Sequence, residues 1–237
     1  HEIVNDTLAG LPLSVTYCPL CNTAIVFDRR VDGRTLDFGT SGNLRNSDLV
    51  MYDRQTESWW QQFSGEAIVG ELTDTTLTRI PSRLLSFEDF RATFPAGQVL
   101  SRQTGHERPY GTTPYAGYDA PGSQTLFDAS NSADRRLDAK ERVVFVEREG
   151  ASVAVPFSAL SQRRTITFWL SGERLTVRWQ PGVASALDAD EIASGRDVGS
   201  AQVTAADGQP VAFDEPFWFS VAAFAPKVRI VRDSDAG

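Results

Sequence analysis

Alternating apolar and polar residues are the main pattern along this chain, and they predict short β-strands. Segments 13–17 and 24–27 are rich in β-branched and aromatic residues, as strands usually are. They flank the Cys18-Pro19-Leu20-Cys21 segment, so we expect a β-hairpin with the two cysteines at its tip. The turn signal Asp32-Gly33, followed by alternation over residues 34–38, extends this hairpin into a β-meander.

Six more segments have the same character and are bounded by Gly, Pro, Asp or Asn. They cover residues 49–52, 57–63, 143–147, 152–155, 165–170 and 175–179. Helix is expected only at 87–94, after Ser86 as a suitable N-cap, and at 217–224, after Pro216. The chain is therefore predicted to be mostly β, with meander or barrel-like sheets and a few short helices.

The two predicted helices have similar aromatic-rich sequences that end near a proline, which leads to the hypothesis of an internal duplication. Residues 1–101 would form a first β unit that carries the cysteine turn, and residues 143–232 a second, degenerate unit within the same compact domain. Residues 102–142 form a long loop region rich in Gly, Pro, Tyr, Ser and Asp, and such loops tend to be functional. Residues 233–237 are expected to be a frayed tail.

Composition narrows the function classes. The chain has 237 residues, of which 41% are hydrophobic, so it can bury a substantial core. Its net charge is -8 and no run of Lys or Arg is present, which argues against a nucleic-acid partner. No apolar stretch is long enough for a transmembrane segment. Nucleophile-elbow, phosphate-loop, dinucleotide and H-E-x-x-H motifs are absent, so hydrolase and nucleotide-binding functions have no motif support.

The cysteine turn is the main candidate for chemistry. A C-P-x-C turn at a hairpin tip resembles the metal knuckle of rubredoxins and zinc ribbons, in which Asn22 would adopt a positive φ. Because the chain has only two cysteines, other groups must complete a metal site. His1 is the leading candidate, since its segment is expected to pair with the first cysteine strand, and Met51 could add a thioether. Such ligands favour a soft or borderline ion, copper or zinc.

Other interpretations of the same residues stay open. The cysteine pair is compatible with a thiol/disulfide redox module, or with a structural disulfide or inert buried thiols beside an ordinary core methionine. A thioredoxin-like mechanism is disfavoured because residues 22–27 have the pattern of a strand rather than a helix. A further hypothesis is a non-catalytic domain that binds a small molecule or a protein through residues 102–142. None of these patterns assigns an enzymatic reaction.

Aromatic, arginine and amide side chains are expected to line a substrate cleft beside the cysteine turn. The candidates for substrate binding are Trp60, Gln62, Arg108, Tyr110, Tyr115 and Tyr118. The competing interpretation places one of the neighbouring tryptophans, Trp59 or Trp60, in the core. His106 is expected to face solvent.

Three carboxylates near these segments are candidates for a general base or a hard metal ligand. They are Asp48, Asp53 and Glu57, although exposed carboxylates at strand ends are the more common occurrence in an acidic protein.

Several segments taken together resemble the prokaryotic domain-of-unknown-function family 3179. The resemblance lies in residues 1–6, 15–21, 27–29, 42–54 and 108–118. Members of that family look like exported proteins or lipoproteins, so the resemblance implies an extracytoplasmic location and a leader before His1. It brings no settled activity with it. The chain departs from the family pattern at Asn22, where Gly is frequent, and its second half looks shortened.

Overall fold

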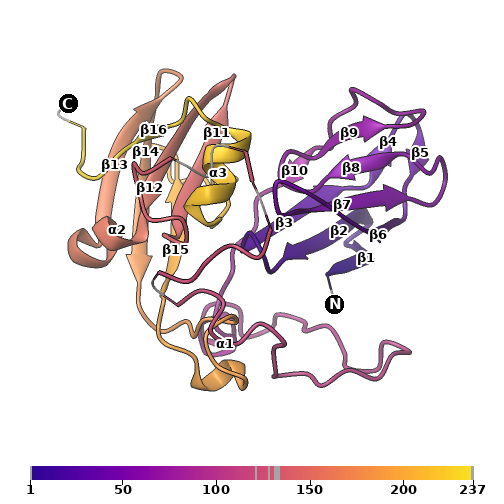
Figure 1. Ribbon diagram of the computed structural model, residues 1–237, viewed down its shortest axis with the longest axis horizontal. Helices are drawn as coiled ribbons and strands as arrows, with labels where there is room; N and C mark the ends of the chain where they lie inside the picture. The colour runs from indigo at the N-terminus through magenta and orange to yellow at the C-terminus, as the bar shows by residue number, and fades with distance from the viewer. Residues whose placement is uncertain (1, 121, 128, 131–133, 236–237) are drawn as a thin grey trace.

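The computed structural model describes residues 2–120, 122–127, 129–130 and 134–235. Within these residues the chain is mostly β, as predicted, with three short α-helices and one 3-10 turn at Ile192–Ser194. Figure 1 shows two groups of sheets side by side, one built from β1 to β10 and the other from β11 to β16. None of the sheets closes into a barrel.

The first group contains two four-stranded antiparallel sheets and a small ribbon. The sheet orders are β1-β2-β3-β10 and β6-β7-β8-β9, and β4 pairs with β5. The strands are β1 (Ile3–Leu8), β2 (Leu11–Cys18), β3 (Thr23–Asp28), β4 (Arg30–Val31), β5 (Arg34–Thr35), β6 (Phe38–Arg45), β7 (Asp48–Asp53), β8 (Trp59–Gln61), β9 (Glu66–Val69) and β10 (Arg79–Ile80).

The predicted hairpin around the cysteines is confirmed. Strands β2 and β3 pair antiparallel, with Cys18 opposite Thr23, and β1 pairs antiparallel with β2. Burial alternates along β3, so that Ile25 and Phe27 enter the core while Ala24, Val26 and Asp28 are partly exposed. This alternation is the period-two pattern of a strand with one buried face. The turn at Asp32-Gly33 is also confirmed, since it joins β4 to β5 with positive φ at both residues.

The second group contains two three-stranded sheets, β11-β12-β16 and β13-β14-β15. In the first of these, β16 runs parallel to β12, so the second group is not a simple meander. Its strands are β11 (Val143–Arg148), β12 (Ala151–Pro156), β13 (Thr165–Leu170), β14 (Glu173–Gln180), β15 (Ser200–Thr204) and β16 (Arg229–Ile230).

Three helices accompany these sheets: α1 (Phe87–Thr93), α2 (Phe157–Arg163) and α3 (Trp218–Phe224). Helix α1 was predicted, and Ser86 is its N-cap, with Oγ accepting the Asp89 N–H at 3.1 Å. Helix α2 was not predicted, because it begins directly after the strand residue Pro156 and lacks a side-chain N-cap.

The helices that prompted the duplication hypothesis have different surroundings. Helix α1 has no buried residue, whereas α3 buries five of its seven residues. Between the two groups of sheets, the described part of residues 102–142 forms no named strand or helix. Near the chain end, the Asp235 N–H donates to the Thr167 carbonyl of β13 at 2.8 Å, so the tail up to this residue is held against the sheet.

Within the described segments, no helix combines the length and the apolar character that crossing a membrane requires.

Candidate metal centre

Two tight turns from different sheets meet at the cysteines. The first turn joins β2 to β3, and the second consists of Asn46 and Ser47 between β6 and β7. Asn46 and Ser47 have φ of 53° and 61°, the left-handed conformation that a two-residue type I′ hairpin requires at both positions. The second turn thereby places the Ser47 carbonyl oxygen 3.2 Å from Cys21 Sγ and 3.9 Å from Cys18 Sγ.

The two thiols lie side by side in the protein interior. Cys18 Sγ and Cys21 Sγ are 3.5 Å apart, and the residues are 2% and 0% exposed. The sulfurs are not joined in a disulfide. Two zinc–sulfur bonds of about 2.3 Å at a tetrahedral angle would hold the sulfurs about 3.8 Å apart. The observed separation is therefore close to the one that a shared ion requires.

The carboxylate of Asp48 completes a cluster of three acidic groups. One of its oxygens and the two sulfurs all lie within 4.8 Å of one another, and Asp48 is fully buried at the start of β7. The Phe63 N–H donates to Asp48 Oδ2 at 2.8 Å, and the amide of Gln61 donates to the same oxygen. These donors fix the orientation of the carboxylate, as second-shell groups do for metal ligands.

Burial makes the charged forms of these groups costly. Desolvation raises the pKa of the Cys21 thiol well above its usual range, and the hydrogen bond with Cys18 and the nearby Asp48 raise it further. Desolvation also raises the pKa of Asp48 to about 6, although the Phe63 N–H and the two thiols lower it in part. A cation at the centre of the cluster would replace the protons and stabilise all three anions.

The cysteine turn is fixed by contacts with distant parts of the chain. Asn22 has φ of 57°, as its position after the second cysteine predicts, and its side-chain amide donates to the Glu215 carbonyl at 2.7 Å. The Phe217 N–H donates to the Cys21 carbonyl at 2.8 Å, and the Tyr118 hydroxyl donates to the Leu20 carbonyl at 3.0 Å. The cluster is therefore preorganised by residues from the long loop region and from the second group of sheets.

The predicted ligands are placed as follows. His1 lies outside the described residues. Met51 is fully buried in the same hydrophobic core as Cys18 and Cys21, and its role as a ligand stays a prediction.

Among the three candidate carboxylates, Asp48 joins the thiols. Asp53 is buried elsewhere, where it accepts hydrogen bonds from Thr56 and from Trp60 Nε1, and Glu57 is exposed. The segment Asn46-Ser47-Asp48 carried a signal for this position, since Asn and Ser tolerate the tight turn that leads into β7.

The predicted substrate-binding residues are spread over the fold. Trp60 and Gln62 are completely buried, and Gln62 bonds to the hydroxyls of Thr16 and Thr23 at 2.9 and 2.7 Å. Tyr118 is buried and Tyr115 is half-buried, with their rings 6.4 Å apart, whereas Arg108 and Tyr110 are exposed on the loop. The exposed solvent-facing position predicted for His106 is observed.

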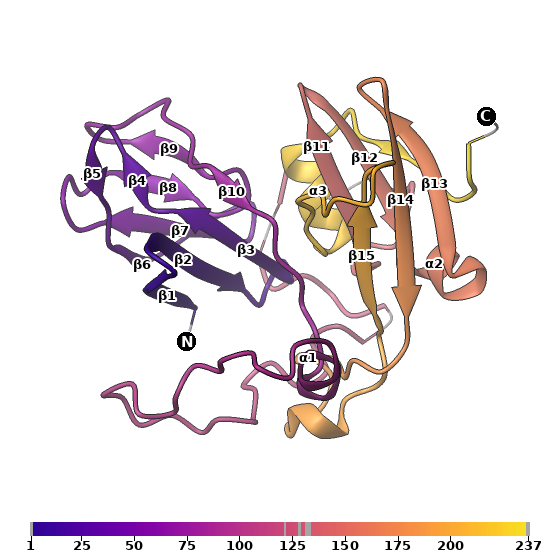
Figure 2. The same cartoon turned by 180° about the vertical axis from the view of Figure 1, so that it is seen from behind.

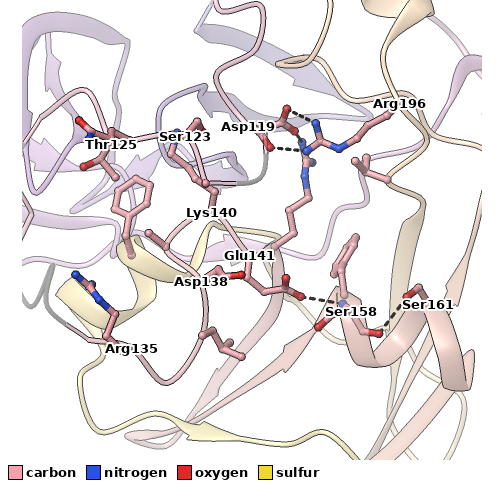
Figure 3. Close-up of a pocket in the computed structure, with 18 of the residues that line it drawn as sticks. Asp119, Ser123, Thr125, Arg135, Asp138, Lys140, Glu141, Ser158, Ser161 and Arg196 are labelled. Carbon is pink, nitrogen blue, oxygen red and sulfur yellow. Dashed lines mark hydrogen bonds and ion pairs between the residues drawn. The ribbon is translucent and has the colours of Figure 1, made fainter.

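A cavity of about 900 Å³ lies among residues 119–142, helix α2 and residues 196–198, and Figure 3 shows its polar lining. The ion pairs of Asp119 with Arg142 and Arg196 form one side of it. Lys140 forms another side. Its Nζ donates to the Tyr118 carbonyl at 2.6 Å and lies 3.1 Å from the centre of the Tyr118 ring. Burial lowers the pKa of Lys140 to about 8.

Tyr118 connects this cavity to the cysteine turn, because its hydroxyl bonds to Leu20 while its carbonyl and ring contact Lys140. None of the six predicted substrate-binding side chains is among the described residues that line the cavity.

Comparison with known proteins gives one match. The model of the family described as Protein of unknown function (DUF3179) matches residues 1–228. No match was found among the curated proteins or among the solved structures.

Proposed function

The chain belongs to the family of proteins of unknown function DUF3179, and from the geometry of its thiol pair we propose that it binds one zinc or copper ion through Cys18, Cys21 and Asp48. The observation that carries this proposal is the meeting of two thiols and a carboxylate within 4.8 Å of one another in a buried site. Buried acidic groups this close destabilise each other unless protons or a cation neutralise them.

Zinc is the ion that this ligand set fits best. Zinc accepts sulfur and oxygen ligands in tetrahedral sites, whereas copper(I) is satisfied by thiolates alone. The Ser47 carbonyl oxygen, 3.2 Å from Cys21 Sγ and 3.9 Å from Cys18 Sγ, is a further oxygen atom beside the cluster. Because both cysteines and Asp48 are buried, a zinc ion here would stabilise the junction of the two turns, as structural zinc does.

The extracytoplasmic location implied by the family resemblance gives such an ion a second role. Thiols in oxidising compartments tend to form disulfides. A bound ion would hold the two thiolates in place and protect them from oxidation.

Metal content tests the proposal directly. Protein purified without chelator or metal-affinity resin is analysed by elemental mass spectrometry, together with Cys18→Ser, Cys21→Ser and Asp48→Asn. We expect about one ion per chain in the parent protein and its loss in both serine variants. Asp48→Asn distinguishes zinc from copper(I), since it should weaken the binding of zinc strongly and that of copper(I) little. Glu57→Gln, an exposed carboxylate of the same region, is the matched control and should retain the ion.

Spectroscopy identifies the ligands. Cobalt(II) bound in place of zinc should give thiolate charge-transfer absorption that disappears in either serine variant. Retention of the full metal content in Cys18→Ser or Cys21→Ser, with native circular dichroism, would rule out thiolate ligation.

Thiol/disulfide exchange is the second candidate function, and the separation of 3.5 Å between the sulfurs favours it. In such a reaction the two thiols would pass two electrons and two protons to a partner disulfide. The raised pKa of Cys21 opposes it, because the thiolate is the attacking species. Thiol titration before and after mild reduction distinguishes the two functions, since a metal-bound pair gains no thiols on reduction.

A further inference from the structure

A separate apolar pocket of about 400 Å³ lies between α1 and β15, where both views of the ribbon show the helix close to the second group of sheets (Figures 1 and 2). Its walls are mainly aliphatic and aromatic, and they include Leu85, Phe90, Phe94, Val203, Val211 and Phe213. The volume falls within the range of small-molecule sites. This pocket is distinct from the cysteine turn and does not depend on a metal ion.

Arg83 is the only charged residue in the described lining of this pocket. Its Nε is buried and has no hydrogen-bond partner, and no ion pair of the described segments includes Arg83. Two other arginines, Arg29 and Arg142, also have an unpaired Nε, but each forms an ion pair through its terminal nitrogens. A buried N–H without an acceptor is costly, and a ligand anion beside the guanidinium would reduce that cost.

Glu215, an acid that interacts electrostatically with Arg83, is not a hydrogen-bonded partner of its guanidinium. Arg83 lowers the pKa of Glu215 electrostatically, but burial dominates and raises that pKa to about 7. The Glu215 carboxylate instead accepts the Ala201 N–H at 3.0 Å. Asp214, the neighbouring acid, pairs with Arg79. No carboxylate of the described residues is therefore bonded to Arg83, whose guanidinium can pair with an anionic group that enters the pocket.

The exposed aromatic residues of helix α1 also indicate that this pocket binds a ligand. The helix has no buried residue, and Phe94, which lines the pocket, is 48% exposed. Aromatic side chains that are exposed around a concave site are typical of ligand-binding surfaces.

We infer that this pocket binds an amphipathic carboxylate, with its apolar tail among Phe90, Phe94 and Phe213 and its carboxylate paired with Arg83. A guanidinium matches a carboxylate with two parallel hydrogen bonds, which gives strength and selectivity. The apolar lining supplies affinity through buried area but does not distinguish a carboxylate from another head group.

Calorimetric titration of the full chain with decanoate, decan-1-ol and decylammonium tests this inference. We expect decanoate to bind at least about tenfold more tightly than the alcohol, and the ammonium to bind most weakly. Arg83→Met keeps an unbranched apolar side chain but removes the charge, so it should abolish the preference for decanoate. Arg83→Lys keeps the charge without the bidentate geometry and should retain part of the preference.

Arg91→Met is the matched control, because Arg91 lies on α1 over the Phe87 ring and does not line the pocket. It should leave decanoate binding unchanged. Equal affinities for decanoate and decan-1-ol, or an unchanged decanoate affinity in natively folded Arg83→Met, would overturn the inference. Self-association that buries this pocket and excludes decanoate, detected by sedimentation, would overturn it as well.

Discussion

Asp48 is the residue on which the metal proposal and the stability of the metal-free protein both depend. Burial raises its pKa to about 6, compared with about 3.9 in an unfolded chain. The folded protein therefore holds a proton on Asp48 at pH values where the unfolded chain has lost it. The stability associated with this proton is fully present below about pH 4 and is lost as the pH rises through about 6. At neutral pH the loss is on the order of 3 kcal/mol.

Asp48→Asn should therefore stabilise the metal-free protein at neutral pH while it weakens zinc binding. Asparagine imitates the neutral acid, because its amide oxygen has two lone pairs and can still accept from both the Gln61 amide and the Phe63 N–H. We expect a gain in the free energy of unfolding of at most about 3 kcal/mol at pH 7 that disappears near pH 4. Urea unfolding in the presence of chelator, at several pH values, measures it. A gain that is the same at pH 4 and pH 7 would contradict the raised pKa of Asp48.

At the scale of elements, the sequence predicted those features of the site that are local. The cysteine hairpin and the positive φ of Asn22 depend on residues within a few positions of one another, and both are confirmed. The approach of Asp48 to the thiols depends on how two sheets pack, which no local pattern specifies. The sequence therefore indicates Asp48 as a candidate ligand but does not place it beside the cysteines. Carboxylates at strand ends are more often exposed to solvent.

The same distinction explains three of the elements that the sequence does not predict. Strands β10 and β16 have two residues each, which is too short for an alternation pattern. Helix α2 shows its amphipathic spacing only through Phe157 and Leu160, the two residues it buries. A single pair at this spacing does not establish a helical period, so tertiary packing decides the outcome.

Substitutions at Asn22 test the turn that holds the cysteines. Asn22→Ala should destabilise the protein by about 2 kcal/mol, because alanine pays about 1 kcal/mol for the left-handed conformation and the hydrogen bond to Glu215 is lost. Asn22→Gly loses only the hydrogen bond and should cost about half as much. Thermal unfolding of the metal-free proteins measures both. Equal costs for alanine and glycine would show that the backbone conformation at Asn22 contributes nothing.

At the scale of the whole molecule, buried polar contacts join the two groups of sheets. Arg79 of β10 pairs with Asp214, which lies beside β11 and exchanges backbone hydrogen bonds of 2.8 and 3.0 Å with Phe145. Arg79 also donates to the Phe63 carbonyl. Asp214 is almost completely buried, and desolvation raises its pKa even though Arg79 lowers it. Loss of Arg79 would leave the buried Asp214 carboxylate without a partner. Removing one member of a buried ion pair destabilises a protein more than replacing both members by apolar residues.

Arg79→Met should therefore destabilise the protein by about 3 to 5 kcal/mol at pH 7, as measured by urea unfolding. Addition of Asp214→Asn should recover much of this loss, because the unpaired charge is then absent. Acidification should reduce the effect of Arg79→Met, since an unpaired Asp214 has a still higher pKa and takes up a proton more readily. The exposed pair of Arg34 and Glu71 is the matched control, and Arg34→Met should cost less than about 1 kcal/mol. If Arg79→Met costs no more than this control, the two groups of sheets are held together by their apolar contacts and backbone hydrogen bonds rather than by this ion pair.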